Sequence, residues 1–203
     1  ALAGAVNTLA WQPAGLLGDN TDGQGLLNDL QQRHGLELSG KRILLLGAGG
    51  ATRGVLLPLL AAQPGALLIA NRTADKAHQL AALFAPHAGP TRLAGCGLEE
   101  IATLIAQQNP FDLVINATSA SLGGEAITLP ANTLGADGFA YDMMYGKTLT
   151  PFLASQQIAG TKHLADGLGM LVEQAAVAFE LWRGVRPASQ PVYEHLRARL
   201  AQP

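Results

Sequence analysis

One short segment constrains the fold of this chain more than any other: an apolar run that ends in a cluster of glycines. The run Ile43 to Leu46 leads directly into this cluster, and a helical pattern begins after it. This order predicts a buried strand, a tight turn and the amino end of a helix. Backbone N–H groups in such a turn approach a pyrophosphate closely, and the helix dipole favours its negative charge. We therefore expect a dinucleotide site at Gly47, Ala48, Gly49, Gly50 and Ala51.

The spacing of the glycines departs from the usual dinucleotide fingerprint, Gly-x-Gly-x-x-Gly. Gly47 and Gly49 occupy the first two positions, but Thr52 stands at the third. We expect Gly54 to supply the close packing of helix on strand that the third glycine usually allows. A purely structural turn is the less favoured alternative. The phosphate loop of kinases and ATPases, Gly-x-x-x-x-Gly-Lys-Ser/Thr, does not occur in the sequence, which disfavours their chemistry.

Strand-like and helix-like patterns alternate after residue 41. The predicted strands are 42–46, 66–70, 91–93, 111–115, 138–141 and 162–164. The predicted helices are 50–62, 74–84, 98–107, 150–157, 168–182 and 192–200. We expect Pro58 to kink the first of these helices or to divide it. A hairpin within residues 1–18 and a helix ending near Arg33 precede this region. The alternation predicts right-handed crossovers and an α/β fold with a doubly wound parallel sheet.

The segment after the second strand of this region indicates which dinucleotide binds. An NAD site usually carries an acidic residue there, which holds the ribose 2′-hydroxyl. This chain has Asn71 and Arg72 instead, followed by Thr73 and Lys76. A guanidinium can hydrogen-bond to a 2′-phosphate that a carboxylate would repel. The sequence therefore favours NADP over NAD, with a polar loop and a solvated Arg72 as the alternative.

Further candidates follow later strands, where ligands lie in open parallel sheets. Residues 116–119 (Asn-Ala-Thr-Ser) end the strand 111–115 and include Thr118. Met143 could pack on a nicotinamide, and Tyr145 could offer a hydroxyl to a substrate. Core packing is the alternative for Met143, and an ordinary strand-to-loop junction is the alternative for 116–119. Gly167 and Gly169 allow close approach of a ligand before the helix that carries Gln174, which needs a polar partner if buried.

Composition excludes several classes of function. A net charge of −2 gives no electrostatic attraction to nucleic acid or to an anionic membrane. A single cysteine, Cys96, cannot form an internal disulfide and fits a reducing compartment. The five histidines lack metal-ligand spacing, no apolar run has the length of a membrane-spanning helix, and no Gly-x-Ser-x-Gly is present. We expect a cytoplasmic protein that binds a small-molecule substrate and no metal, nucleic acid or membrane.

Taken together, these segments resemble the shikimate dehydrogenase family. The matching segments appear in the family's order over nearly the whole chain: 5–8 (AVNT), 19–23 (DNTDG), 47–51 (GAGGA), 71–73 (NRT), 116–119 (NATS), 141–145 (YDMMY) and 166–174 (DGLGMLVEQ). The resemblance implies NADPH-dependent reduction of 3-dehydroshikimate to shikimate in aromatic amino-acid biosynthesis. A quinate/shikimate dehydrogenase and a non-catalytic NADP-binding module remain the alternatives.

The resemblance also assigns roles to individual residues. It implies that shikimate contacts Asn7, Asp22, Tyr145 and Gln174. It implies that NADP contacts residues 47–51, Asn71, Arg72, Thr73, Lys76, Thr118, Met143, Gly167 and Met170. In the family, a lysine and the equivalent of Asp22 form the catalytic pair. An ordinary aspartate is ionised at neutral pH and is a poor acid alone, so Asp22 would orient the lysine and accept a substrate hydroxyl.

The family pattern further implies a division of the chain. Family members begin with a substrate domain that carries a serine pair and the catalytic lysine, and none of these precedes Ala1. We expect 1–21 to be a remnant of that domain, 22–186 to be the NADP-binding domain and 187–203 to be a helix that returns toward the substrate domain. The chain as given should then bind NADP but be catalytically impaired. An uncovered apolar face would favour a homodimer.

Overall fold

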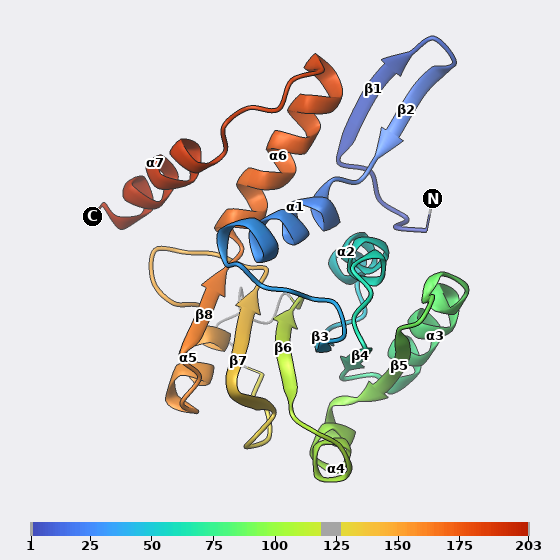
Figure 1. Ribbon diagram of the computed structural model, residues 1–203, viewed down its shortest axis with the longest axis vertical. Coiled ribbons are helices and arrows are strands. Elements are labelled where there is room, and N and C mark those ends of the chain that lie inside the picture. Colours follow the sequence, from blue (N-terminus) through green and yellow to red (C-terminus); the bar gives the residue numbers. More distant parts are fainter. Residues whose placement is uncertain (1, 119–126, 203) are drawn as a thin grey trace.

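A six-stranded parallel sheet forms the centre of the computed structural model, which describes residues 2–118 and 127–202 (Figure 1). The strand order is β5-β4-β3-β6-β7-β8, and each neighbouring pair is parallel. The first strand of the sheet, β3, lies in its middle. The chain then adds β4 and β5 toward one edge, returns to the other side of β3, and adds β6, β7 and β8 toward the other edge. The predicted doubly wound α/β fold is confirmed. The strands are β3 Arg42–Leu46, β4 Ala66–Asn71, β5 Arg92–Gly97, β6 Phe111–Asn116, β7 Leu134–Asp142 and β8 His163–Asp166.

Helices connect the strands and cover both faces of the sheet (Figure 1). Their bounds are α1 Asp22–Asn28, α2 Gly50–Ala61, α3 Ala74–Phe84, α4 Ile101–Gln107, α5 Pro151–Ile158, α6 Leu168–Arg183 and α7 Gln190–Ala201. Three short turns extend them: a π-helical turn, Asp29–Arg33, after α1, and 3-10 turns, Ala85–His87 after α3 and Leu98–Glu100 before α4.

The core consists of two apolar layers, one on each face of the sheet. Because successive side chains of a strand point to opposite faces, the all-apolar strand β3 contributes to both. Ile43 and Leu45 pack among buried residues of α1, α2, α3 and α6. Leu44 and Leu46 pack among buried residues of α4 and α5. Burial on both faces explains why the sequence of β3 shows no polar alternation.

The predicted elements are present, and α2 differs from the predictions in two respects. It is not divided at Pro58 but runs without interruption from Gly50 to Ala61, so a kink there stays a prediction. Gly54 does not pack the helix on a strand, because its nearest neighbour is the side chain of Asn20, 3.2 Å from where a Cβ would lie. A proline removes only its own N–H, so the single carbonyl left without that donor is the one at Gly54. That carbonyl and the Pro58 ring both face Gly23 of α1.

The segment before α1 forms a separate antiparallel hairpin, as predicted. Strands β1 (Thr8–Gln12) and β2 (Gly15–Asp19) pair only with each other and project from the body beside α6 (Figure 1). The indole Nε1 of Trp182 in α6 donates to the carbonyl of Leu9, at 2.8 Å. The side chain of Trp11 is 83% exposed. The hairpin is therefore tied to the body at its base and presents apolar side chains to solvent.

Replacing Gly23 tests how closely α1 and α2 must approach. A Cβ at this position would lie 2.5 Å from Pro58 Cγ and 2.6 Å from the Gly54 carbonyl oxygen. We expect Gly23→Ala to lower the free energy of unfolding by roughly 1–3 kcal/mol, the usual cost of overpacking. Urea denaturation measures the change. Gly146→Ala is the control, since nothing lies within 3.4 Å of its added Cβ. Equal stability of the two variants would contradict this account of the contact.

Candidate functional site

A cavity of about 680 Å³ opens at the carboxyl ends of β3, β4 and β6. This is the edge where parallel sheets bind ligands, and the volume suits a small molecule. Eight of the residues predicted to bind the cofactor line it: Gly47, Ala48, Gly49, Gly50, Ala51, Asn71, Arg72 and Thr118. The other described residues that line it are Ala70, Leu98, Ala117 and Ile127, so the wall also offers small and apolar contacts.

The glycine turn is held rigidly at the mouth of this cavity. Gly47 has φ of +103°, a conformation that favours glycine, and its N–H donates to the Ala70 carbonyl at 2.8 Å. The buried hydroxyl of Thr52 donates back to the Gly47 carbonyl at 2.9 Å. Thr52 therefore closes the turn from inside. The first N–H groups of α2 stay available to an anion, because its N-cap, Gly49, has no capping side chain.

The wall formed by the loop after β4 is polar, and none of the described residues that line the cavity is acidic. Asn71 donates from its side chain to the Thr73 carbonyl at 3.0 Å, which shapes the loop. The exposed guanidinium of Arg72 makes no hydrogen bond or ion pair with the rest of the described chain, so it is available to a ligand. Thr73 is the N-cap of α3, but its side chain makes no capping bond. Lys76 is exposed one turn into the same helix.

A buried hydrogen-bond network joins the loops after β6 and β7. The hydroxyl of Thr118 donates to Asn116 Oδ1 at 2.7 Å, and Asn116 Nδ2 donates to Asp142 Oδ1 at 3.1 Å. The same carboxylate accepts from the backbone N–H of Met144 and from the hydroxyl of Thr150. Asp142 thus fixes Thr118 on one side and the backbone beside Met143 on the other. Ser119, which belonged to the same sequence pattern, lies outside the described residues.

The Met143 segment packs directly against the start of α6. A Cβ at Gly167 would lie 2.1 Å from the Met143 carbonyl oxygen, so only glycine fits there. Met143 is half-buried against the core, whereas Met170 is buried within it. Neither side chain lines the cavity beside the glycine turn. Met143 thus lies in the loop after β7, at the carboxyl end of the sheet, whereas the Met170 side chain packs in the hydrophobic core.

A second polar cluster brings together three of the four predicted substrate residues. Asn7 Nδ2 donates to Asp22 Oδ1 at 2.8 Å, and Asn7 Oδ1 accepts from the Thr21 N–H at 3.0 Å. The Thr21 hydroxyl also lies 3.2 Å from Gln174 Oε1 and donates to it. The cluster therefore unites the hairpin, α1 and α6 around Thr21, which is 1% exposed. Tyr145 is exposed after β7 and forms no hydrogen bond to the cluster within the described chain.

Sequence reasoning missed three residues that hold these clusters in place: Thr21, Asp142 and Asp29. Asp29 is fully buried and accepts from the Tyr141 hydroxyl at 2.7 Å and from Arg33 Nε at 2.8 Å. Burial, reinforced by the Asp29 charge, raises the pKa of Tyr141 well above its usual value. Thr21 and Asp142 lie inside the matched family segments 19–23 and 141–145, but neither residue was assigned a role. Asp29 was identifiable only as a polar residue within an apolar pattern.

Two other classes of site are absent from the described residues. No three His, Cys, Asp or Glu side chains lie together there as metal ligands would. No described helix has both the length and the apolar character to cross a membrane.

The parallel sheet, the glycine turn and the cavity at its carboxyl edge define a Rossmann-like domain. The sequence matches the family described as shikimate / quinate 5-dehydrogenase over residues 29–123. It matches the shikimate 5′-dehydrogenase C-terminal domain over residues 167–197. The chain belongs to the shikimate dehydrogenase family.

Individual relatives agree with this assignment. The chain is 55% identical to shikimate dehydrogenase (NADP(+)) of Aromatoleum aromaticum, over 98% of this chain and 69% of that protein. An Ael1 enzyme from Pseudomonas putida has a similar structure, with a TM-score of 0.83 and 45% identity over 100% of this chain and 70% of that one. Shikimate 5-dehydrogenase of Thermus thermophilus, solved with NADP(H) and shikimate, has a TM-score of 0.77 and 33% identity. The match covers 98% of this chain and 69% of that one. The chain thus spans about 70% of the length of these relatives.

Replacing Thr21 tests whether it organises the polar cluster. We expect Thr21→Val to lower the free energy of unfolding by about 1 kcal/mol, because the change removes a buried hydroxyl that donates to a side-chain oxygen. NMR of the Gln174 side-chain amide should show a shift. Thr73→Val is the control, since the Thr73 hydroxyl makes no capping bond. An unperturbed Gln174 resonance in Thr21→Val would show that the hydroxyl does not position it.

Proposed function

We propose that this chain belongs to an NADP-dependent shikimate dehydrogenase and binds NADP(H) and shikimate. Such an enzyme interconverts 3-dehydroshikimate and shikimate. The observation that carries the proposal is the free guanidinium of Arg72 in the wall of the glycine-turn cavity, whose described lining residues include no acidic one. A second support is the cluster of Asn7, Asp22 and Gln174 around Thr21. The names of the relatives, NADP-dependent shikimate dehydrogenases, agree with both.

The residues of the cavity suit the parts of a bound NADP. We assign the pyrophosphate to residues 47–51 and the amino end of α2, because free N–H groups and the helix dipole both favour an anion there. Asn71, Arg72, Thr73 and Lys76 would surround the 2′-phosphate. We assign the nicotinamide side to Thr118, Met143, Gly167 and Met170. Because Met170 is buried, its side chain would have to repack before it could contact the nicotinamide. NADPH, when bound, supplies the hydride for ketone reduction.

The polar cluster would hold the substrate. Asn7 donates to Asp22 Oδ1, which leaves Asp22 Oδ2 to accept a substrate hydroxyl. Gln174 and Tyr145 would contribute further hydrogen bonds from α6 and the loop after β7. Reduction of a ketone leaves an oxygen that needs a proton. Among the described residues no lysine pairs with Asp22, so we propose that Asp22 orients a proton donor and does not itself supply the proton.

Three finer assignments extend this proposal. We assign residues 1–21 to a substrate-binding region, 22–186 to the NADP-binding domain and 187–203 to a helix directed toward the substrate region. We propose a cytoplasmic protein. Exposed apolar side chains on the hairpin, with Leu9 and Leu16 both more than half exposed, favour a homodimer. A quinate/shikimate dehydrogenase is the second candidate, because the matched family is described by both substrates.

Replacing Arg72 tests the cofactor assignment. We expect Arg72→Ala to weaken NADP binding roughly tenfold to a hundredfold, the range for a charged hydrogen-bonding partner. NAD has no 2′-phosphate, so its affinity should change less than about twofold by the same reasoning. Isothermal titration calorimetry with each dinucleotide measures both values. Arg199→Ala, at an exposed position on α7, is the control. Equal weakening of NADP and NAD would exclude a role for Arg72 in binding the 2′-phosphate.

The second test separates cofactor binding from catalysis. We expect the 203-residue chain alone to bind NADP but to show no measurable NADP reduction with shikimate or quinate, because no described residue pairs with Asp22 as a proton donor. Absorbance at the nicotinamide band measures turnover. Full-length Aromatoleum aromaticum enzyme serves as the positive control. Turnover by this chain would refute the proposed impairment, and a preference for quinate would favour the second candidate.

A further inference from the structure

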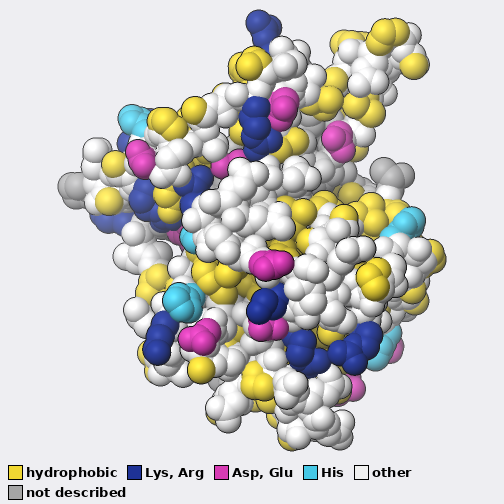
Figure 2. Space-filling view, viewed as in Figure 1, with side chains coloured by type: hydrophobic (Ala, Val, Ile, Leu, Met, Phe, Trp, Pro, Cys, Tyr) yellow, Lys and Arg dark blue, Asp and Glu magenta, His cyan; other side chains and the backbone are white. Residues whose placement is uncertain are grey.

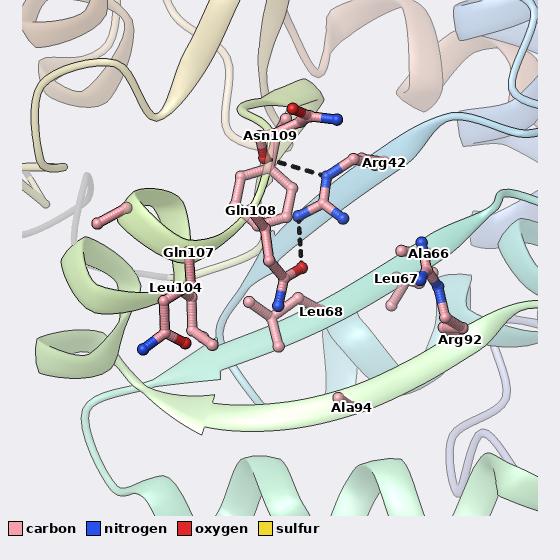
Figure 3. Close-up of a pocket in the computed structure, with 12 residues that line it drawn as sticks. Arg42, Ala66, Leu67, Leu68, Arg92, Ala94, Leu104, Gln107, Gln108 and Asn109 are labelled. Carbon is pink, nitrogen blue, oxygen red and sulfur yellow. Dashed lines mark hydrogen bonds between the residues drawn. The ribbon is translucent and has the colours of Figure 1, made fainter.

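A groove of about 620 Å³ lies at the opposite edge of the sheet from the glycine turn (Figure 3). It opens at the amino ends of β3, β4, β5 and β6, and the last turn of α4 forms its other wall. Nothing in the proposed dehydrogenase function uses this edge. We call it the arginine groove and define it by Arg42, Leu68, Arg92, Ala94, Leu104 and Phe111.

The register of three strands creates the mouth of the groove. Arg42 of β3 pairs with Ala66 of β4, and Ala66 pairs with Arg92 of β5. Residues in one such row point to the same face of the sheet, so both arginines flank a small alanine. Strands lie about 4.8 Å apart, which separates the two arginine backbones by about 10 Å. The gap over Ala66 is therefore bounded on both sides by a cation.

The floor behind the arginines is apolar. Leu68 and Ala94 follow in the next row of the same face, and Leu104 approaches from α4. Leu68 and Leu104 are only partly buried, while Ala94 is exposed. The cause is the length of α4, which has 7 residues and cannot cover β4 and β5 along their whole length. An apolar strip of the sheet thus remains open next to two positive charges.

The two arginines differ in how they are held. Arg42 donates from Nε to the Asn109 carbonyl at 3.1 Å and from Nη2 to Gln108 Oε1 at 3.0 Å (Figure 3). Its guanidinium also lies over the Phe111 ring, 5.1 Å from the centroid. Its Nη1 donates to no other described residue. Arg92 is exposed, and its guanidinium makes no hydrogen bond or ion pair within the described chain.

The charges in this region are not balanced. Burial and the neighbouring charge of Arg92 lower the pKa of Arg42, while Asp112 raises it. Asp112 is itself paired with Lys41, at 3.5 Å, and accepts from the Arg42 backbone N–H. Figure 2 shows Lys and Arg side chains close together in the lower half of the molecule, with acidic side chains beside some of them. An anion between the arginines would relieve their repulsion.

We propose that the arginine groove binds a small organic carboxylate that carries an apolar ring or chain. The carboxylate accepts from the free N–H groups of Arg42 and Arg92 across Ala66, and the apolar part covers Leu68, Ala94 and Leu104. Charge complementarity favours a carboxylate as the polar group of this ligand, since a guanidinium can donate two parallel hydrogen bonds to it. The open apolar floor selects against a bare inorganic anion. This site is separate from the NADP cavity, because the two lie at opposite ends of the same strands.

The experiment titrates the 203-residue chain with 2-naphthoate, followed by NMR and calorimetry. We expect saturable binding, with shifts confined to the amino ends of β3, β4 and β5. Arg92→Gln should weaken binding about tenfold, equivalent to one charged hydrogen bond. Arg199→Gln removes an exposed guanidinium elsewhere and should leave the affinity unchanged. Ala66→Leu fills the gap without removing a charge and should weaken binding as well, provided that circular dichroism shows both variants folded.

Several results would overturn the proposal. Equal affinity for the neutral 2-naphthamide would show that the arginines do not recognise the carboxylate. Equal affinity for inorganic phosphate would show that the apolar floor contributes nothing. Displacement of 2-naphthoate by saturating NADP would place the probe in the other cavity. Unchanged affinity in both Arg92→Gln and Ala66→Leu would exclude the groove. None of these results depends on whether the chain catalyses a reaction.

Discussion

The arrangement of the molecule depends on the hydrogen bonds at the end of its central strand. β3 pairs with β4 on one side and with β6 on the other. At the last residue, the Leu46 carbonyl accepts from Ala117, and the next N–H, at Gly47, donates to Ala70. The backbone then reverses at a positive φ. These bonds place the glycine turn, the loop after β4 and the loop after β6 around one cavity.

Much of this arrangement could be predicted from the sequence, because the signals are local. An apolar run before glycines specified β3 and α2, and the position after β4 identified the loop that holds Arg72. The same local reasoning failed at Gly54 and did not decide between a kink and a division at Pro58. There the contact partners, Asn20 and α1, are distant in sequence, and no pattern within α2 reveals them. The length of β7, which starts at Leu134 rather than at Gly138, was likewise set by pairing with β6.

The partners of the buried charged side chains could not be predicted from the sequence. Glu173 lies within an apolar helix and is buried, yet it accepts from Arg33, Arg186 and Ser189. Asp29 and Asp142 are fully buried with comparable sets of donors. The donors to Glu173 and to Asp29 include residues from elements more than 100 positions away in the chain. A buried charge without such partners would be costly, so these networks restrict how α1, α6 and the segment after α6 can sit together.

The hairpin of β1 and β2 has one more consequence. A two-stranded ribbon is marginal on its own, and each of its strands has a neighbour on one side only among the described residues. Backbone N–H and C=O groups on the outer sides can therefore pair with any extended polypeptide, whatever its side chains. Growth of this ribbon into a wider sheet would give Trp11 and Leu16 further cross-strand neighbours. The ribbon is thus a template on which additional strands, from the same or another polypeptide, can assemble.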